Sequence, residues 1–184
     1  MKKFIIAITG ASGVCYAIRL FDFLKPGFEL HVICSERGAE LLSIEAGLTP
    51  AYFAGDNSTV HKNSRMNSSI ASGSFSCDGM VVIPASMGTV GRIANGISSS
   101  LVERAADVML KERNKLIIVP RETPLSAIHL KNFLALDQAG AVILPACPGF
   151  YYGPKSVDDI VDFVVAKVLD QLDVEHDLAG PYRP

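Results

Sequence analysis

The sequence contains no tryptophan, and none of its apolar runs reaches the ~18 residues that a membrane-spanning helix needs. Its four cysteines include no CxxC pair, which argues against a zinc site and a disulfide framework and favours reduced thiols in a cytoplasmic protein. Neither sign of charge dominates, because 17 Lys and Arg face 19 Asp and Glu for a net charge of −2. This balance argues against nucleic-acid binding and against a polybasic membrane anchor. The length of 184 residues predicts one compact domain, 1–184, that is long enough to bury a core.

What the sequence does contain is an alternation of apolar runs with helix-like segments. None of the apolar runs alternates with polar residues, which indicates strands buried on both faces. The predicted strands are residues 4–8, 30–34, 80–83, 116–119 and 141–144. The predicted helices are residues 14–24, 36–46, 97–113, 125–139 and 157–172, the last with Ser156 as its N-cap. This order predicts an α/β fold with a parallel sheet covered on both faces. The polar stretch 56–76 is the longest irregular segment, and it is a candidate lid or interface.

Glycines and small polar residues follow the first three predicted strands, at the edge where ligands of such folds bind. Residues 9–13 (TGASG) can bring backbone N–H groups to an anion at a helix N-terminus, although a tight turn with a serine cap explains them equally well. The segment matches neither GxGxxG nor a Walker A motif, which disfavours dinucleotide and ATP sites. Ser35 either caps a helix or binds a ligand, and capping is the more common role. Residues 84–89 (PASMGT) offer small groups that suit the carbonyls and ring nitrogens of a flat heterocycle.

The last two strand ends carry charged and aromatic residues. Arg121 and Glu122 stand between two prolines. Arg121 suits bidentate phosphate binding, while Glu122 either accepts a proton or neutralises the arginine. Lys111 lies near the end of a predicted helix, where a solvated lysine is the simpler interpretation. After the fifth strand, a turn rich in proline and glycine displays Tyr151, whose hydroxyl suits a phosphate. No histidine has a partner at metal-ligand spacing and GxSxG is absent, so neither a metal site nor a serine hydrolase is favoured.

Taken in order, six segments resemble the UbiX-type flavin prenyltransferase family over residues 1 to about 182. They are 9–13 (TGASG), 71–75 (ASGSF), 86–89 (SMGT), 104–108 (RAADV), 120–125 (PRETPL) and 148–151 (PGFY), of which PRETPL and SMGT are the most specific. The resemblance implies a Rossmann-like three-layer α/β/α flavoprotein with a mainly parallel sheet, assembled as a homododecamer with sites between subunits. It implies metal-independent transfer of a dimethylallyl group from dimethylallyl monophosphate to N5 and then C6 of reduced FMN. The prenylated FMN would serve UbiD-type decarboxylases, including one of ubiquinone biosynthesis.

The resemblance also implies roles for the residues at matching positions. FMN would be held by Gly10, Ala11, Ser12, Ser35, Ser86, Met87, Gly88, Thr89 and Arg121. The phosphate of the prenyl donor would be held by Lys111, Arg121, Tyr151 and Lys167. Ser12, Arg104, Lys111 and Glu122 would form the catalytic group. In that group fixed cations stabilise the departing phosphate, and Glu122 acts as a general base.

Three positions depart from the family pattern. Lys167 stands where the family usually has arginine, which keeps the charge but loses bidentate geometry. The family often places tryptophans in the pocket, where a ring face stabilises positive charge on the allylic group. Here Tyr182 takes the C-terminal aromatic position and Met66 falls near the other.

Two other functions are compatible with parts of this pattern. One is an FMN-dependent cysteine decarboxylase of a related family, but its PASANT segment reads PASMGT here and His61 stands in a poorly matched context. The other is a flavin carrier without catalytic activity. Such a carrier needs none of Lys111, Glu122 and Tyr151, so their joint presence favours the enzyme.

Overall fold

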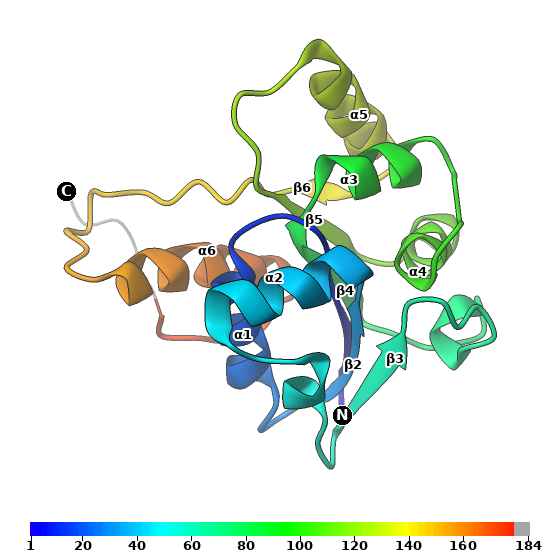
Figure 1. Ribbon diagram of the computed structural model, residues 1–184, viewed down its shortest axis with the longest axis horizontal. Helices are drawn as coiled ribbons and strands as arrows, with labels where there is room; N and C mark the ends of the chain where they lie inside the picture. The colour runs from blue at the N-terminus through cyan, green and yellow to red at the C-terminus, as the bar shows by residue number, and fades with distance from the viewer. Residues whose placement is uncertain (179–184) are drawn as a thin grey trace.

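The computed structural model describes residues 1–178, and a sheet of six parallel strands forms its centre (Figure 1). In chain order the strands are β1 Lys3–Ile8, β2 Glu29–Cys34, β3 Ser58–Lys62, β4 Gly79–Ala85, β5 Leu116–Pro120 and β6 Val142–Ile143. They pair in the order β3-β2-β1-β4-β5-β6, and every pairing is parallel. This is the strand order of the Rossmann fold, so the predicted α/β class and parallel sheet are confirmed.

Helices cover both faces of the sheet and complete three layers (Figure 1). They are α1 Val14–Leu24, α2 Glu36–Ala46, α3 Met87–Ala94, α4 Leu101–Lys111, α5 Ala127–Gln138 and α6 Val157–Gln171, with short 3₁₀ turns at η1 Pro50–Phe53 and η2 Ser69–Ala71. Phe4 and Ile6 of β1 pack in one apolar cluster with buried residues of α1, α2 and α6. Ile5 and Ala7 pack in the other cluster with α3, α4 and α5. Both faces of the strand are therefore apolar, which is why it shows no polar alternation.

Four segments differ from the sequence-based expectation. The stretch 56–76 is not wholly irregular, because it contains β3 and η2. β3 is an edge strand that pairs only with β2, so it keeps polar residues that a search for apolar runs overlooks. No helix is predicted at residues 87–94, where two glycines lower helix propensity, yet α3 forms there with Ser86 as its N-cap. The predicted strand 141–144 is confirmed only as Val142–Ile143, and the predicted helix 97–113 begins at Leu101.

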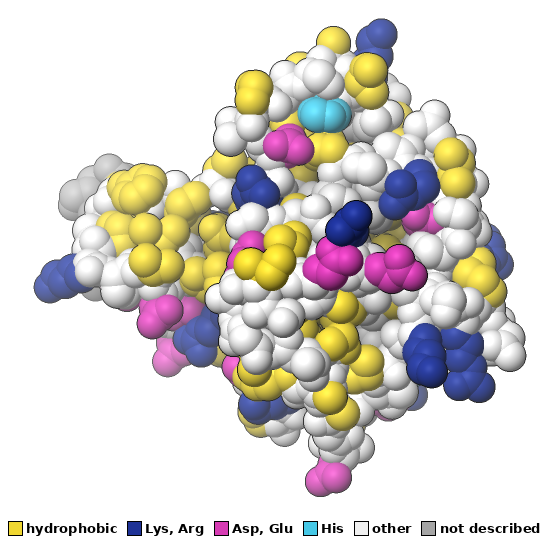
Figure 2. All heavy atoms as spheres, viewed as in Figure 1, with side chains coloured by type: hydrophobic (Ala, Val, Ile, Leu, Met, Phe, Trp, Pro, Cys, Tyr) yellow, Lys and Arg dark blue, Asp and Glu magenta, His cyan; other side chains and the backbone are white. Residues whose placement is uncertain are grey.

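The surface mixes charges of both signs on the face drawn in Figure 2, in keeping with the balanced composition. The outer side of α5 is different, because Ile128, Leu130 and Leu134 are each more than half exposed. Exposed large apolar side chains gathered on one helix are typical of a surface that another protein chain covers.

Candidate active site

The carboxyl ends of β1 and β4 lie side by side, where the connections diverge toward opposite edges of the sheet. The buried side chain of Thr9 joins these two ends. Its Oγ1 donates to the Pro84 carbonyl at 2.8 Å and accepts the Ser86 N–H at 2.7 Å. A cavity of about 900 Å³ opens beside this junction. Ligands of open α/β sheets bind at such a switch point, so the cavity is the candidate active site.

Two helix N-termini border the cavity. Ser35 accepts the Gly38 N–H at 3.0 Å and caps α2, and Ser86 accepts the Thr89 N–H at 3.4 Å and caps α3. The capping role predicted for Ser35 is confirmed, and its place in the cavity lining leaves a ligand role open as well. Both helix dipoles place partial positive charge at the cavity, which favours an anion there.

The loop after β1 lies close against α2. A Cβ on Gly10 would approach the Arg37 Cβ to 2.7 Å, so only glycine allows this separation. The Ala11 N–H donates to the Thr9 carbonyl at 2.8 Å, which tightens the turn, and Ala11 itself is buried. Gly10 and Gly88 both line the cavity, and Met87 begins α3 beside Gly88. Backbone rather than side chains therefore forms part of the wall, as suits a flat ligand.

Arg121 and Ser12 meet although they are far apart in the sequence. The Arg121 Nε donates to the Ser12 carbonyl at 3.1 Å. Glu45, at the end of α2, accepts the Gly13 and Val14 N–H groups at 2.9 and 3.1 Å. Burial by itself raises the pKa of Glu45, but hydrogen bonds from these groups and from Ser12, with the charge of Arg121, lower it below its usual value. Arg121, Ser12 and Glu45 thus form one charged group at the N-terminus of α1.

Sequence reasoning misses Glu45, because nothing at the end of a helix marks a glutamate that caps another helix. The separation of 32 residues between Glu45 and Gly13 is closed only by the packing of α2 beside α1. The left-handed backbone of Gly13, with φ of 103°, and the absence of a side-chain cap on α1 are the structural signs of this role.

The predicted general base Glu122 and the predicted phosphate ligands Tyr151 and Lys167 lie on the β5 and β6 side of the sheet. The Glu122 carboxylate accepts the N–H of Thr123 at 2.9 Å and is exposed. Tyr151 packs edge-on against Phe163 of α6 with ring centroids 5.9 Å apart. Lys167 of α6 pairs with Asp170 at 3.0 Å and lines a separate groove of about 390 Å³ that Phe163 also borders.

Lys111 and Arg104 do not join this group within one chain. α4 runs back from the carboxyl edge, so Lys111, its last residue, lies at the amino edge of the sheet, where it pairs with Glu112. Arg121 follows the far end of β5. Arg104 pairs with Asp107 at 2.6 Å and donates to the Ala71 carbonyl at 3.1 Å. The chain therefore holds both residues beside the segment 71–73, away from the cavity.

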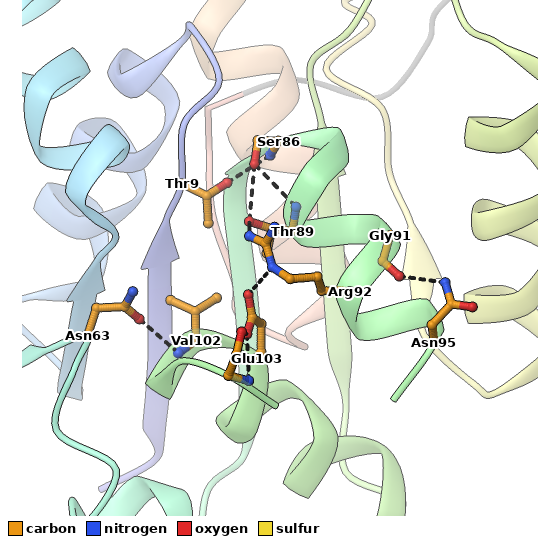
Figure 3. Close-up of polar contacts among 10 residues, drawn as sticks. Thr9, Asn63, Ser86, Thr89, Gly91, Arg92, Asn95, Val102 and Glu103 are labelled. Atoms are coloured by element: carbon orange, nitrogen blue, oxygen red, sulfur yellow. Dashed lines mark hydrogen bonds and ion pairs between the residues drawn. The ribbon is translucent and has the colours of Figure 1, made fainter. Parts of the chain in front are cut away.

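A polar chain runs from the junction of β1 and β4 into α4 (Figure 3). Ser86 donates to the Thr89 hydroxyl at 3.1 Å, Arg92 donates to the same hydroxyl at 3.4 Å, and the Arg92 Nε donates to Glu103. Glu103 is only 2% exposed. Burial by itself raises its pKa, but hydrogen bonds from Ser99 and Arg92 lower it, so the carboxylate stays charged. The small polar cluster predicted at 84–89 thus continues into an ion pair between the exposed Arg92 and the buried Glu103, which sequence reasoning misses.

His61 of β3 also lines the cavity, and its ring nitrogens already have partners. Its Nε2 lies 2.8 Å from the Nδ1 of His31, and its Nδ1 lies 2.8 Å from the hydroxyl of Ser68. Burial, followed by the charges of His31 and Arg65, lowers the pKa of His61. Among residues 1–178, no cluster of three or more His, Cys, Asp or Glu side chains is arranged to hold a metal ion. None of the helices in that range is long and apolar enough to cross a membrane.

Comparison with known proteins places this geometry in context. The family model described as Flavoprotein matches residues 1–169. The flavin prenyltransferase UbiX of Halalkalibacterium halodurans is 48% identical, over 94% of this chain and 89% of its own length. The crystal structure of AnUbiX (PadA1) with FMN and dimethylallyl pyrophosphate superposes with a TM-score of 0.95 at 37% identity, covering 100% of this chain and 98% of the other. The dodecameric FMN-dependent UbiX-like decarboxylase from Escherichia coli O157:H7 gives a TM-score of 0.93 at 43% identity, covering 99% and 100%.

Proposed function

Because the chain belongs to the flavoprotein family and, within it, to the UbiX flavin prenyltransferases, we propose that it transfers a dimethylallyl group from dimethylallyl monophosphate to N5 and C6 of reduced FMN. The observation that carries this proposal is the cavity at the β1–β4 switch point, beside which Arg121 is held on the Ser12 carbonyl. A flat flavin and a small phosphate need just such a pair of adjoining sites.

The residues around the cavity fit FMN. Its volume of about 900 Å³ lies within the range of pockets that enclose ligands of this size. Ser35, Ser86 and Thr89 line it together with Gly10 and Gly88, and these residues would hold the flavin. When bound, reduced FMN supplies the nucleophilic ring atoms that accept the dimethylallyl group.

The donor phosphate would be bound by Arg121, Tyr151 and Lys167. An alkyl monophosphate is a poor leaving group, so fixed donors around its oxygens stabilise the charge that develops as the carbon–oxygen bond breaks. The bond from Arg121 to Ser12 fixes the guanidinium before the substrate binds. A donor bound through its phosphate at Arg121 would hold its allylic carbon near the flavin site, which would contribute a proximity effect.

Lys111 and Arg104 would enter the site from a neighbouring copy of the chain. Within one chain Lys111 lies at the amino edge of the sheet, far along β5 from Arg121. The relative from Escherichia coli is described as dodecameric. The exposed Ile128, Leu130 and Leu134 on α5 would be covered in an assembly of that kind. A homododecamer with sites between subunits therefore brings together the cations that one chain separates.

Proton handling would fall to Glu122, with Ser12 and Glu45 nearby. Glu122 is exposed, and among residues 1–178 its carboxylate accepts a hydrogen bond only from the neighbouring Thr123 N–H, so it would be available to take the proton lost when the flavin nitrogen is alkylated. The lowered pKa of Glu45 keeps a negative charge beside Ser12. That charge orients the loop 10–13 through backbone N–H groups.

The product would be passed to a UbiD-type decarboxylase. We also propose a cytoplasmic location, supported by four cysteines that carry no disulfide, and a single flavoprotein domain over 1–184. The aromatic position expected at Tyr182 lies outside the described residues. A cysteine decarboxylase receives less support, because His61 is engaged by His31 and Ser68.

The proposal is tested by anaerobic incubation of the protein with reduced FMN and dimethylallyl monophosphate, followed by mass spectrometry of the flavin. The expected product is heavier than FMN by one five-carbon unit. A parallel incubation with dimethylallyl pyrophosphate shows which donor is preferred. Flavin of unchanged mass with both donors, in protein that binds FMN, would overturn the proposal and favour a flavin carrier.

A further inference from the structure

One arginine stands over the first turn of α3, at the cavity wall. Arg92 lines the cavity, and its Nη2 donates to the Thr89 hydroxyl at 3.4 Å. A Cβ on Gly88 would lie 3.4 Å from the Arg92 Nη1, so the guanidinium is directly beside the Gly88 backbone. Guanidinium N–H donors therefore lie where the N-terminus of α3 already favours an anion.

A buried carboxylate sets the position of this arginine. Glu103 of α4 accepts from the Arg92 Nε, and its other oxygen accepts the Ser99 N–H and hydroxyl at 2.8 and 2.6 Å (Figure 3). Glu103 is only 2% exposed, and these hydrogen bonds hold both of its carboxylate oxygens. Within the described residues 1–178, the Arg92 Nη1 has no hydrogen-bond acceptor. The protein thus holds the Nε and Nη2 groups of Arg92, and the Nη1 group can donate a hydrogen bond to a ligand.

The groups around Arg92 at the N-terminus of α3 suit a phosphate monoester. It combines a fixed guanidinium with the hydroxyls of Ser86 and Thr89, which lie 3.1 Å apart. The reaction brings two such phosphates together, one on FMN and one on the prenyl donor. Since two dianions repel each other, they need separate cations, and the proposed function assigns Arg121, held on the Ser12 carbonyl, to the phosphate of the prenyl donor.

We propose that Arg92 binds the phosphate of FMN and makes the site select FMN over riboflavin, with Glu103 as the positioning residue. This inference rests on the proposed function, since it takes the cavity to be the flavin site. Charge alone does not produce the selection of FMN over riboflavin. The ion pair with Glu103 has no net charge, so selection depends on the direction in which the guanidinium is held.

The test is a fluorescence titration with FMN and with riboflavin on the full chain. Arg92→Gln is expected to raise the Kd for FMN about tenfold and leave the Kd for riboflavin unchanged. Because Arg92→Gln leaves a buried carboxylate unpaired, the double variant Arg92→Gln/Glu103→Gln is measured too, with the same expectation. Glu103→Gln alone is expected to reduce the FMN-to-riboflavin preference in part. Arg65→Gln, which removes an arginine that lies outside the cavity lining and bonds Asn67, is the matched control.

Three results distinguish the alternatives. An unchanged FMN-to-riboflavin preference in both Arg92 variants would overturn the inference while the proposed function stands. An unchanged preference with a raised KM for dimethylallyl monophosphate would also overturn it, because Arg92 would then serve the other phosphate. A parent protein that binds neither flavin would instead refute the proposed function itself.

Discussion

Replacing Gly38 by alanine tests how closely α2 must approach the sheet beside the candidate site. Gly38 lies in the first turn of α2, against the end of β1. A Cβ there would lie 2.4 Å from the Ile8 carbonyl oxygen and 2.8 Å from its carbon. Both are backbone atoms, and the same oxygen accepts the Ser35 N–H at 2.9 Å. The new methyl group falls roughly 1 Å short of normal contact distance, so α2 has to move away.

The size of the effect follows from three contributions. Overpacking against immobile backbone costs about 3 kcal/mol, the upper end of its usual range. Displacing Ser35 weakens the cap of α2 by about 1 kcal/mol, while alanine gains about 1 kcal/mol over glycine in helix propensity. We therefore expect Gly38→Ala to lower the free energy of unfolding by about 3 kcal/mol, and the Tm by about 6–12 °C for a chain of this length.

The assay is urea and thermal denaturation at one fixed protein concentration, together with FMN titration. Gly27→Ala is the matched control, because a Cβ at Gly27 meets no atom within 4 Å. That variant is expected to stay within about 0.5 kcal/mol of the parent protein. If Gly38→Ala is as stable as Gly27→Ala, the close approach of α2 to β1 is not a constraint and the reasoning fails.

Three further predictions concern Glu45, His61 and the catalytic group. Glu45→Ala removes the carboxylate that caps α1 and is expected to lower the free energy of unfolding by about 1 kcal/mol in urea, whereas unchanged stability would contradict the capping role. The pKa of His61 is lowered by burial and by its charged neighbours, so the folded protein binds a proton less readily than the unfolded chain. Stability is then expected to fall as the pH drops below about 6.5, and less so in His61→Gln; superimposable pH profiles of Tm would refute this. Glu122→Gln is expected to keep FMN bound but slow prenylation. Lys111→Ala is expected to raise the KM for dimethylallyl monophosphate more than the Kd for FMN. Mass spectrometry gives the prenylation rates of both variants, and flavin titration gives their FMN binding. Full turnover in both variants would overturn these roles.

Much of the fold is predictable because strands buried on both faces appear in the sequence as runs of apolar residues. The runs at 30–34 and 116–119 fall within β2 and β5, since strands covered on both faces are mostly apolar; His31 is the one polar residue in these two runs. β3 shows no such run, because an edge strand with one partner tolerates Ser58, Thr59 and Lys62. The sequence pattern that would predict α3 is weak, because the stability of this helix comes from the Ser86 cap and from packing of Val90 and Ile93 rather than from helix propensity.

The candidate site likewise contains residues that the sequence predicts and residues that it does not. Ser12, Ser35, Ser86 and Arg121 are predictable as residues at the carboxyl edge of the sheet, because each follows a strand and parallel strands end at one edge. The contact of Glu45 with the α1 N-terminus depends on the packing of α2 beside α1. Local sequence composition does not show which helices lie side by side, so this contact cannot be predicted from it.

The sequence alone predicts most of the buried strands, their parallel direction and the loops that gather at the carboxyl edge. It does not predict that Glu103 holds Arg92, or that Lys111 lies at the opposite edge from Arg121, because these placements depend on the packing of distant segments. Burial and capping act over a few neighbouring residues, whereas the distance between two charged side chains depends on strand order and helix packing across the whole chain.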